Sequence, residues 1–274
     1  MSDPGAVFRA LHRPGDPFIL ANAWDPGSAR MLAALGARAI ATSSAAQAFT
    51  LGLPDGSLTR DQALAHAQDL VAATQLPVSG DFEDGWGDAP ETVAETVRLA
   101  AEAGLAGISI EDTPHPDAAH YDRDLAIERI RAGAAAARAL PRDFVFCARA
   151  DGVMNGRYDL HEALARIAAF DAAGADVLYV PLPGDLAALE RVCTATSKPV
   201  NVLAAGPLAR HDRAALAQAG AARISLGSAL ARVTHAAIRD AGIAMFRDGD
   251  FTPLTRGMPG AEVDAMLTDA GPRT

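Results

Sequence analysis

The sequence predicts a single (β/α)8 barrel of the TIM type over residues 1–274, with additional helices toward the C-terminus. The length of 274 residues suits one large α/β domain, and half of the residues are apolar, which is enough for a large core. A pattern also recurs along the chain, in which an alanine-rich helical stretch ends at a glycine and a short apolar strand follows. Eight such strands in roughly 250 residues imply a parallel sheet that closes into a barrel.

The recurring unit of helix, glycine and strand identifies four strands directly: LGARAIATS (35–43), AGLAGISIED (103–112), AGADVLYVP (173–181) and AGAARISLG (219–227). The glycines at 36, 104, 174 and 220 are expected just past a helix end, in the left-handed conformation. Four more strands are expected at 18–22, 77–83, 144–151 and 198–203. A doubly wound open sheet is the competing fold, but no G-x-G-x-x-G follows the first strand.

Helix start signals support this division of the chain. Asp25 precedes Pro26, a typical pairing of an N-cap acceptor with a proline in the first turn, and Thr59 is expected to cap the next long helix. Pro90 opens another helix. The 228–248 segment reads as a helix, and the 256–274 tail is expected to end in a helix packed on the body or on a partner subunit.

Charge and hydropathy exclude several classes of function. The formal net charge is −10 and no Lys/Arg run is present, which argues against a nucleic-acid partner. No apolar run approaches the roughly 18 residues of a membrane span, and the N-terminus lacks the apolar core of a signal peptide. Cys147 and Cys193 form neither a metal motif nor a disulfide framework and are expected as small buried hydrophobes. A cytoplasmic location is expected.

Acidic residues gather where the third and fourth predicted strands end. Asp81 and Glu83 close the third strand, and Glu111 closes the fourth. Since side chains alternate along a strand, Asp81 and Glu83 are expected to face the same side. Three converging carboxylates need a counter-charge, and oxygen ligands without Cys or His favour Mg²⁺, with Mn²⁺ as an alternative. Glu83 could instead simply pair with an arginine or lysine.

Arg149, at the end of the fifth predicted strand, is the one cation among the strand-end residues considered. Its planar fork suits a carboxylate or phosphonate. Mg²⁺ and Arg149 facing each other across a small cavity would hold a 2-oxo acid and stabilise an enolate. A structural interpretation is retained for neighbouring acids: Asp84 and Asp88 as turn and cap residues, Asp112 and Asp151 as acceptors for loop N–H groups.

Several motifs in this order resemble the phosphoenolpyruvate mutase/isocitrate lyase superfamily over nearly the whole chain, including its 2-methylisocitrate lyase-like and phosphonomutase-like members. The motifs are ANAWDPGSAR, the serine-rich strand end leading to LGLPDG, DFEDGWGD, GISIED and CARADG. DFEDGWGD is the most specific, since it is similar to the metal motif D-x-D-x-G-[YF]-G of that superfamily.

The resemblance implies roles for particular residues. Asp81 would bind Mg²⁺ directly, and Glu83 and Glu111 would act mainly through metal-bound waters. The substrate would be a small carboxylate or phosphonate. Its implied contacts are Ser43, Ser44, Arg149 and Asn201, with Asp55 as an active-site acid. The resemblance also implies a homo-oligomer, a dimer or tetramer, in which subunits exchange a C-terminal helix.

Three departures from the superfamily pattern limit this inference. Glu83 replaces an aspartate; the loop after the fourth strand, TPHPDAAHYDRD, lacks the lyase cysteine; and Thr113 stands where the mutases have lysine. His115, His120 and Tyr121 are candidates for an acid in that loop.

The predicted function is therefore Mg²⁺-dependent cleavage of a C–C bond in a small 2-oxo or 2-hydroxy carboxylate through a pyruvate-like enolate. The alternatives are P–C bond chemistry, of the phosphonomutase or phosphonopyruvate hydrolase type, and a non-catalytic barrel that binds a small acid.

Overall fold

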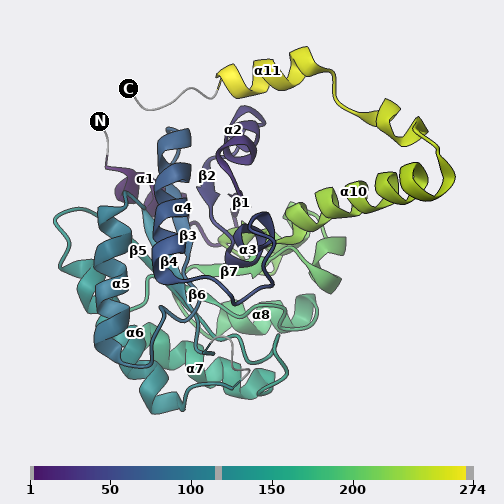
Figure 1. Ribbon diagram of the computed structural model, residues 1–274. Helices are drawn as coiled ribbons and strands as arrows, with labels where there is room; N and C mark the ends of the chain where they lie inside the picture. Colours follow the sequence, from purple (N-terminus) through teal and green to yellow (C-terminus); the bar gives the residue numbers. More distant parts are fainter. Residues whose placement is uncertain (1–2, 115–118, 270–274) are drawn as a thin grey trace.

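The computed structural model describes residues 3–114 and 119–269. Its centre is a closed barrel of parallel strands in sequential order, so the predicted barrel is confirmed (Figure 1). The ring closes where β8 pairs with β1, with Leu20 aligned to Ser225. The strands are β1 (Phe18–Asn22), β2 (Ala39–Ala41), β3 (Val78–Asp81), β4 (Gly107–Ile110), β5 (Val145–Arg149), β6 (Val177–Tyr179), β7 (Val200–Leu203) and β8 (Arg223–Ser225).

Helices surround the barrel (Figure 1). They are α1 (Pro4–Leu11), α2 (Pro26–Ala34), α3 (Ser44–Thr50), α4 (Arg60–Ala73), α5 (Pro90–Glu102), α6 (Arg123–Arg138), α7 (Leu160–Ala173), α8 (Leu186–Thr194), α9 (Arg213–Gln218), α10 (Ala229–Asp248) and α11 (Gly260–Asp269), with short 3-10 turns η1 (Gly206–Arg210) and η2 (Thr252–Arg256). None of the helices described is both long and apolar enough to cross a membrane.

The predicted helix boundaries are largely confirmed. Asp25 caps α2 with a reciprocal bond to Ser28, and Thr59 caps α4 in the same way with Gln62. Gly174 ends α7 at φ +103°, where a side chain would be strained. The other three predicted glycines, Gly36, Gly104 and Gly220, share that positive φ.

Two local predictions are wrong. β3 ends at Asp81 rather than extending through Glu83. The AFTLGLPDGS segment (48–57), for which the sequence predicts a Gly/Pro-bearing loop, begins inside α3, whose N-cap is Ser43. An alanine-rich run directly after a capping serine favours a short helix, and the glycines and proline further along the segment obscured this signal.

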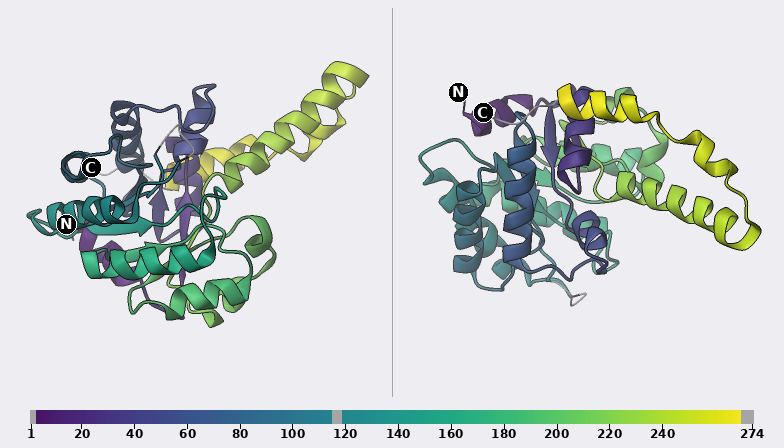
Figure 2. Two further views of the ribbon diagram at one scale, coloured as in Figure 1. Left: turned by 90° about the horizontal axis from the view of Figure 1, so that it is seen from below. Right: turned by 45° about the horizontal axis from the view of Figure 1, so that its top comes forward.

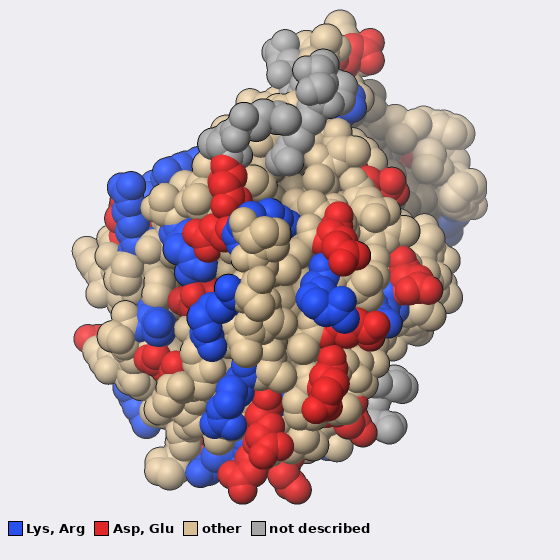
Figure 3. All heavy atoms as spheres, turned by 90° about the vertical axis from the view of Figure 1, so that its left-hand side faces the viewer, with Lys and Arg blue, Asp and Glu red and all other residues tan. Residues whose placement is uncertain are grey.

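A continuous apolar core lies between the strands and the helices α2 to α8. Inside the barrel, toward the C-terminal ends of the strands, many buried side chains are polar or charged. They replace the branched aliphatic residues that usually fill a barrel interior. On the outer surface, basic and acidic side chains are interspersed over the face that carries α5 (Figure 3). Ion pairs such as Arg60 to Glu95, at 2.8 Å, account for part of this mixture.

The C-terminal segment leaves the barrel. Figures 1 and 2 show α10 projecting outward, after which the chain returns through η2 so that α11 packs on α2. Ala231 is the one buried residue recorded for α10, while Phe246 is 90% exposed. Near the point where α10 departs, Ile19 of β1 points outward and is 47% exposed. The outer face of β1 therefore lacks the covering helix that a barrel strand usually has.

Candidate active site

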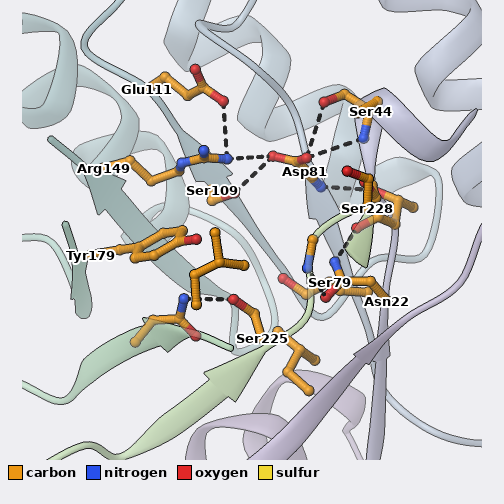
Figure 4. Close-up of a pocket in the computed structure, with 18 of the residues that line it drawn as sticks. Asn22, Ser44, Ser79, Asp81, Ser109, Glu111, Arg149, Tyr179, Ser225 and Ser228 are labelled. Atoms are coloured by element: carbon orange, nitrogen blue, oxygen red, sulfur yellow. Dashed lines mark hydrogen bonds and ion pairs between the residues drawn. The ribbon is translucent and has the colours of Figure 1, made fainter. Parts of the chain in front are cut away.

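A cavity of about 200 Å³ lies at the C-terminal ends of the barrel strands (Figure 4). This is the end at which (β/α)8 enzymes hold their catalytic groups. Every strand contributes at least one lining residue, and loops after β2 and β5 add the rim. The predicted site residues that line it are Ser43, Ser44, Asp55, Asp81, Glu111, Arg149 and Asn201.

Arg149 is the centre of the charged layer. Its Nη1 atom lies 2.7 Å from Asp81 Oδ1 and 3.0 Å from Glu111 Oε1, and its Nη2 atom lies 2.7 Å from Asp151 Oδ1. The ring of Tyr179 faces the guanidinium at 5.0 Å. Burial opposes the charge, but the three carboxylates outweigh it and raise the pKa of Arg149 well above its ordinary value.

Asp81 is held in place by β2 and the start of α3. The Ser44 backbone N–H and hydroxyl both donate to Asp81 Oδ2, at 3.1 and 3.0 Å. The Asp81 N–H donates to Thr42 Oγ1 at 2.7 Å, and Ser109 Oγ lies 3.5 Å from Oδ1. Its carboxylate is therefore fixed before any ligand arrives, which is the preorganisation that a metal ligand requires.

Asp112 supports this layer by accepting a backbone N–H, as predicted, whereas Asp151 pairs with the Arg149 side chain rather than with a loop N–H. Asp112 accepts from the Asp151 N–H at 2.8 Å, from Tyr158 Oη at 2.6 Å and from Arg166 Nη1 at 3.0 Å. Burial raises the pKa of both acids, and for Asp151 the neighbouring Arg149 opposes that rise. These hydrogen bonds form a rigid support for the Arg149 side chain.

The other predicted substrate contacts occupy different parts of the cavity. Ser43 is 2% exposed, and its hydroxyl accepts from Ala46 N at 3.3 Å as the α3 cap. Asn201 is 1% exposed on the inner face of β7. Asp55 lies at the exposed rim between α3 and α4, where it accepts from the Gly56 N–H. Ser44 faces Asp81 rather than standing apart as a separate anion contact.

Glu83 does not follow the alternation expected of a strand. Its φ is +43°, and it is 1% exposed and absent from the cavity lining. Because β3 has already ended at Asp81, the chain turns at Glu83, so the strand alternation on which the prediction for its side chain depends does not extend to this residue. Asp84 does serve as a turn acceptor, since the Trp86 N–H donates to its Oδ1 at 3.0 Å. The cap role predicted for Asp88 is wrong, because the N-cap of α5 is Ala89, without a side-chain cap bond, and Asp88 instead lies 2.9 Å from Tyr121 Oη.

The donor set suits a hydrated Mg²⁺ better than a fully protein-ligated metal. Within residues 3–114 and 119–269, no group of three or more His, Cys, Asp or Glu side chains is clustered tightly enough to hold an ion alone. Asp81 and Glu111 nevertheless converge on one Arg149 nitrogen, so a cation already stands between them. Two carboxylates with surrounding hydroxyls and open volume fit Mg²⁺, which keeps several waters.

The loop after β4 is only partly described. His115 lies outside the described residues, and His120 is exposed with its ring edge-on to Tyr158 at 5.6 Å. Tyr121 is 6% exposed, and burial together with its bond to Asp84 raises its pKa. Tyr121 therefore anchors the loop base, and it does not line the cavity.

Sequence reasoning missed several cavity residues, among them Ser109, Tyr179 and Arg223. Tyr179 and Arg223 occupy apolar strands, so burial disguised them as core positions. Arg223 carried a usable signal, because an arginine at the start of an apolar barrel strand is unexpected unless it has a partner.

Fold and cavity together define a (β/α)8 enzyme with an acidic, arginine-centred site. Residues 8–246 match the family model described as phosphoenolpyruvate phosphomutase, and the chain belongs to this family. It is an enzyme of the phosphoenolpyruvate mutase/isocitrate lyase superfamily, so the predicted resemblance is confirmed.

Similar proteins include named lyases. The 2-methylisocitrate lyase of Salmonella typhimurium is 32% identical over 210 residues, covering 73% of this chain and 70% of that protein. An oxaloacetate decarboxylase of Chromohalobacter salexigens is 32% identical over 207 residues, with 73% and 70% covered. A solved structure from Burkholderia cenocepacia J2315, provisionally assigned as a lyase or mutase, is 48% identical with a TM-score of 0.91, covering 95% of this chain and 94% of that one.

Proposed function

We propose that this protein is a Mg²⁺-dependent lyase that cleaves a C–C bond of a small 2-oxo or 2-hydroxy carboxylate. The observation that carries the proposal is the ratio of charges at Arg149, where one guanidinium meets the carboxylates of Asp81, Glu111 and Asp151. Such a cluster repels an anionic substrate unless a further cation joins it. A divalent cation restores balance and leaves the guanidinium free to bind the substrate.

The chain's own residues account for substrate orientation. Arg149 would bind the C1 carboxylate through its planar fork, and Ser43 would donate to the same group from the α3 cap. Bound Mg²⁺, held by Asp81 with Glu111 nearby, would supply the Lewis acid that polarises the C2 oxygen. The cavity excludes bulk water because Glu111 and Arg149 are almost fully buried.

The bond change is simplest for a 2-oxo dicarboxylate. The electron pair of the C3–C4 bond forms a C2–C3 double bond, and the π pair of the C2 carbonyl moves onto its oxygen. C4 leaves as CO2, and a pyruvate enolate remains. A proton then returns to C3. Asp55, exposed at the rim, is the residue we assign to carry it from solvent. The named oxaloacetate decarboxylase among the similar proteins supports testing this substrate first.

Isothermal calorimetry with oxalate, a planar mimic of the pyruvate enolate, tests the proposal. Oxalate is expected to bind the Mg²⁺-loaded protein at least about 100-fold more tightly than the metal-free protein. Equal affinity in both states, or no binding in either, overturns the proposal. A panel containing oxaloacetate, 2-methylisocitrate and phosphonopyruvate then assigns the bond: a new ³¹P signal from phosphonopyruvate selects P–C chemistry, and release of CO2 or pyruvate from oxaloacetate or 2-methylisocitrate selects C–C cleavage.

We also propose that the protein assembles as a homo-oligomer, with a second copy of this chain covering the exposed apolar groups of the C-terminal segment. These groups include Val233, Ile238, Phe246, Phe251 and Leu254, all more than half exposed. The same copy would cover Ile19 on β1, next to the groove formed with Leu32 and Leu35. Such an extended apolar surface is unusual for a monomer.

Sedimentation velocity tests the assembly. The wild-type chain is expected to sediment as a dimer or tetramer, and Phe246→Glu is expected to shift it toward the monomer. A matched control, Glu262→Gln on α11, is expected to leave the distribution unchanged. A wild-type monomer at micromolar concentration contradicts the proposal.

A further inference from the structure

Arg223 is the second arginine that lines the cavity, and its surroundings differ from those of Arg149. β8 directs it into the barrel, where it is 3% exposed. Its Nε donates to Asn201 Oδ1 at 2.8 Å and its Nη2 to Cys147 Sγ at 3.1 Å. Its Nη1 faces His12 Nε2 at 3.4 Å.

All three of these neighbours are neutral. Burial, with Arg223 as the next cause, lowers the pKa of His12 to about 3, and its Nδ1 lies 2.9 Å from the Phe8 carbonyl. His12 therefore carries its proton on Nδ1 and accepts at Nε2. Burial raises the pKa of the Cys147 thiol, so it stays protonated. Among the described residues, Arg223 forms no ion pair, in contrast to Arg149 with three.

A buried guanidinium without a carboxylate is costly, and replacement by an apolar side chain of similar size normally loses nothing. Two of its five N–H groups also have no acceptor among the side chains described above, since three are used. A buried arginine without a carboxylate partner in the chain therefore implies that a bound anion from outside the chain balances its charge.

The cavity gives that charge a place. Arg223, Asn201 and Ser225 form one part of its lining, called the floor below, and Figure 4 shows Ser225 across the cavity from Asp81 and Arg149. Because Arg223 holds Asn201 Oδ1, the amide nitrogen Nδ2 is directed to Ser225 Oγ, at 2.8 Å. The floor therefore presents N–H and O–H groups and a positive field to whatever fills the cavity.

We propose that Arg223 is a specificity-determining residue whose uncompensated charge makes the cavity favour dianionic over monoanionic ligands, while it fixes the direction of the Asn201 amide. This inference rests on the proposed function, in that it assumes a small carboxylate binds in the cavity. A purely structural role for Arg223, as a plug of the barrel floor, gives different expectations for binding.

The test compares oxalate, a dianion, with pyruvate, a monoanion, by calorimetry on the Mg²⁺-loaded protein. Arg223→Met removes the charge and keeps the length of the side chain. We expect oxalate affinity to fall by about 10- to 100-fold and pyruvate affinity by about 3- to 10-fold, because the lost field acts on two ligand charges in the first case and on one in the second. The thermal midpoint is expected to stay unchanged or rise.

Two further variants keep the test decisive if Arg223→Met does not fold. Arg223→Gln can still donate to Asn201 but is neutral, and it is expected to lose the same preference for oxalate. Arg223→Lys keeps the charge and is expected to retain most of that preference. Cys147→Ser, which replaces one neutral neighbour by another, is the matched control and is expected to leave both affinities unchanged.

The possible failures are distinguishable. A wild-type protein that binds neither ligand with Mg²⁺ overturns the proposed function, and this inference falls with it. In a second outcome, the wild type binds oxalate and folded Arg223→Met or Arg223→Gln binds it equally well, with only a lower thermal midpoint. That outcome overturns this inference alone and assigns Arg223 a structural role. Equal losses for oxalate and pyruvate also contradict it, because they indicate distortion rather than charge.

Discussion

Arg149 and Asp81 form a buried ion pair at 2.7 Å although they are 68 residues apart in sequence. The pair joins β3 to β5 across the intervening β4, whose Glu111 contacts the same arginine nitrogen. The guanidinium therefore occupies the space between two carboxylates that a metal would share. Under the proposed function, binding of a cation and binding of a substrate anion would be coupled, since a cation at Asp81 would free donors of Arg149.

Asp81→Asn tests this coupling from the acidic side. The amide keeps the size of the side chain, but it is a poor Mg²⁺ ligand and cannot pair with Arg149. We expect Mg²⁺-dependent oxalate affinity to fall by at least about 100-fold. The thermal midpoint should change by only about a few degrees, because Arg149 still forms ion pairs with Glu111 and Asp151.

The control for Asp81→Asn is Asp16→Asn, which breaks an exposed pair with Arg213 at 2.8 Å far from the cavity. It is expected to leave oxalate binding unchanged. Retention of wild-type affinity by Asp81→Asn would remove Asp81 as the metal ligand.

Arg149→Met tests the coupling from the cationic side. Removing the guanidinium leaves three largely buried carboxylates without their counter-charge, and we expect a loss of about 3–5 kcal/mol in the free energy of unfolding. Mg²⁺ should then stabilise the variant more than it stabilises the wild type, because the ion replaces the missing cation. Thermal denaturation with and without 10-fold excess EDTA over metal measures the difference, and an equal Mg²⁺ shift in both proteins would contradict it.

Arg149→Lys separates charge from shape. A lysine retains one positive charge but loses the fork that meets Asp81 and Asp151 from two nitrogens. Its stability is expected to lie between that of the wild type and Arg149→Met, while turnover on any accepted 2-oxo acid falls by about 100-fold or more. Near-normal turnover would show that the planar fork is not used.

The barrel could be predicted because its signals are local. Glycines such as Gly174, caps such as Asp25 and Thr59, and short apolar runs each encode their own element, and the count of units then implies closure. The sequence also allowed the grouping of three site residues to be predicted, because strand ends of a closed parallel barrel meet on one side. These residues are Asp81, Glu111 and Arg149.

Other site features depend on contacts that the sequence does not encode locally. The turn at Glu83 arises where β3 stops early, and period-two alternation cannot show where a strand ends. Arg223 has neutral partners from β5, β7 and α1, so no charge pattern in the sequence points to it.

Gly107→Ala tests the packing beneath the site. A Cβ at Gly107 would lie 2.3 Å from the backbone carbonyl oxygen of Val145, which cannot move without breaking the β4–β5 pairing. We expect a loss of about 2–4 kcal/mol in unfolding free energy. Gly27→Ala is the matched control, because its Cβ meets only Asp25 at an ordinary 3.5 Å. Equal denaturation midpoints for the two variants would contradict the β4–β5 geometry.

His12 predicts a pH dependence of stability that originates below the cavity. Burial and then Arg223 lower its pKa from 6.5 to about 3, so the folded protein holds it neutral while the unfolded chain protonates it near 6.5. Its contribution is therefore fully present above pH 6.5 and is lost as the pH falls from there toward 3. At pH 5 the loss is on the order of 1–2 kcal/mol.

His12→Gln isolates that contribution, because glutamine can still accept from Arg223 but does not titrate. Asp143 and Glu162, whose pKa values are lowered chiefly by hydrogen bonds from arginines, also lose stability in acid, but they do so equally in both proteins. Urea denaturation of the two proteins between pH 7.5 and 5 should therefore show a steeper decline for the wild type. Parallel curves would mean that His12 is protonated in the folded state, and Arg223 would then face a second positive charge at 3.4 Å rather than a neutral acceptor.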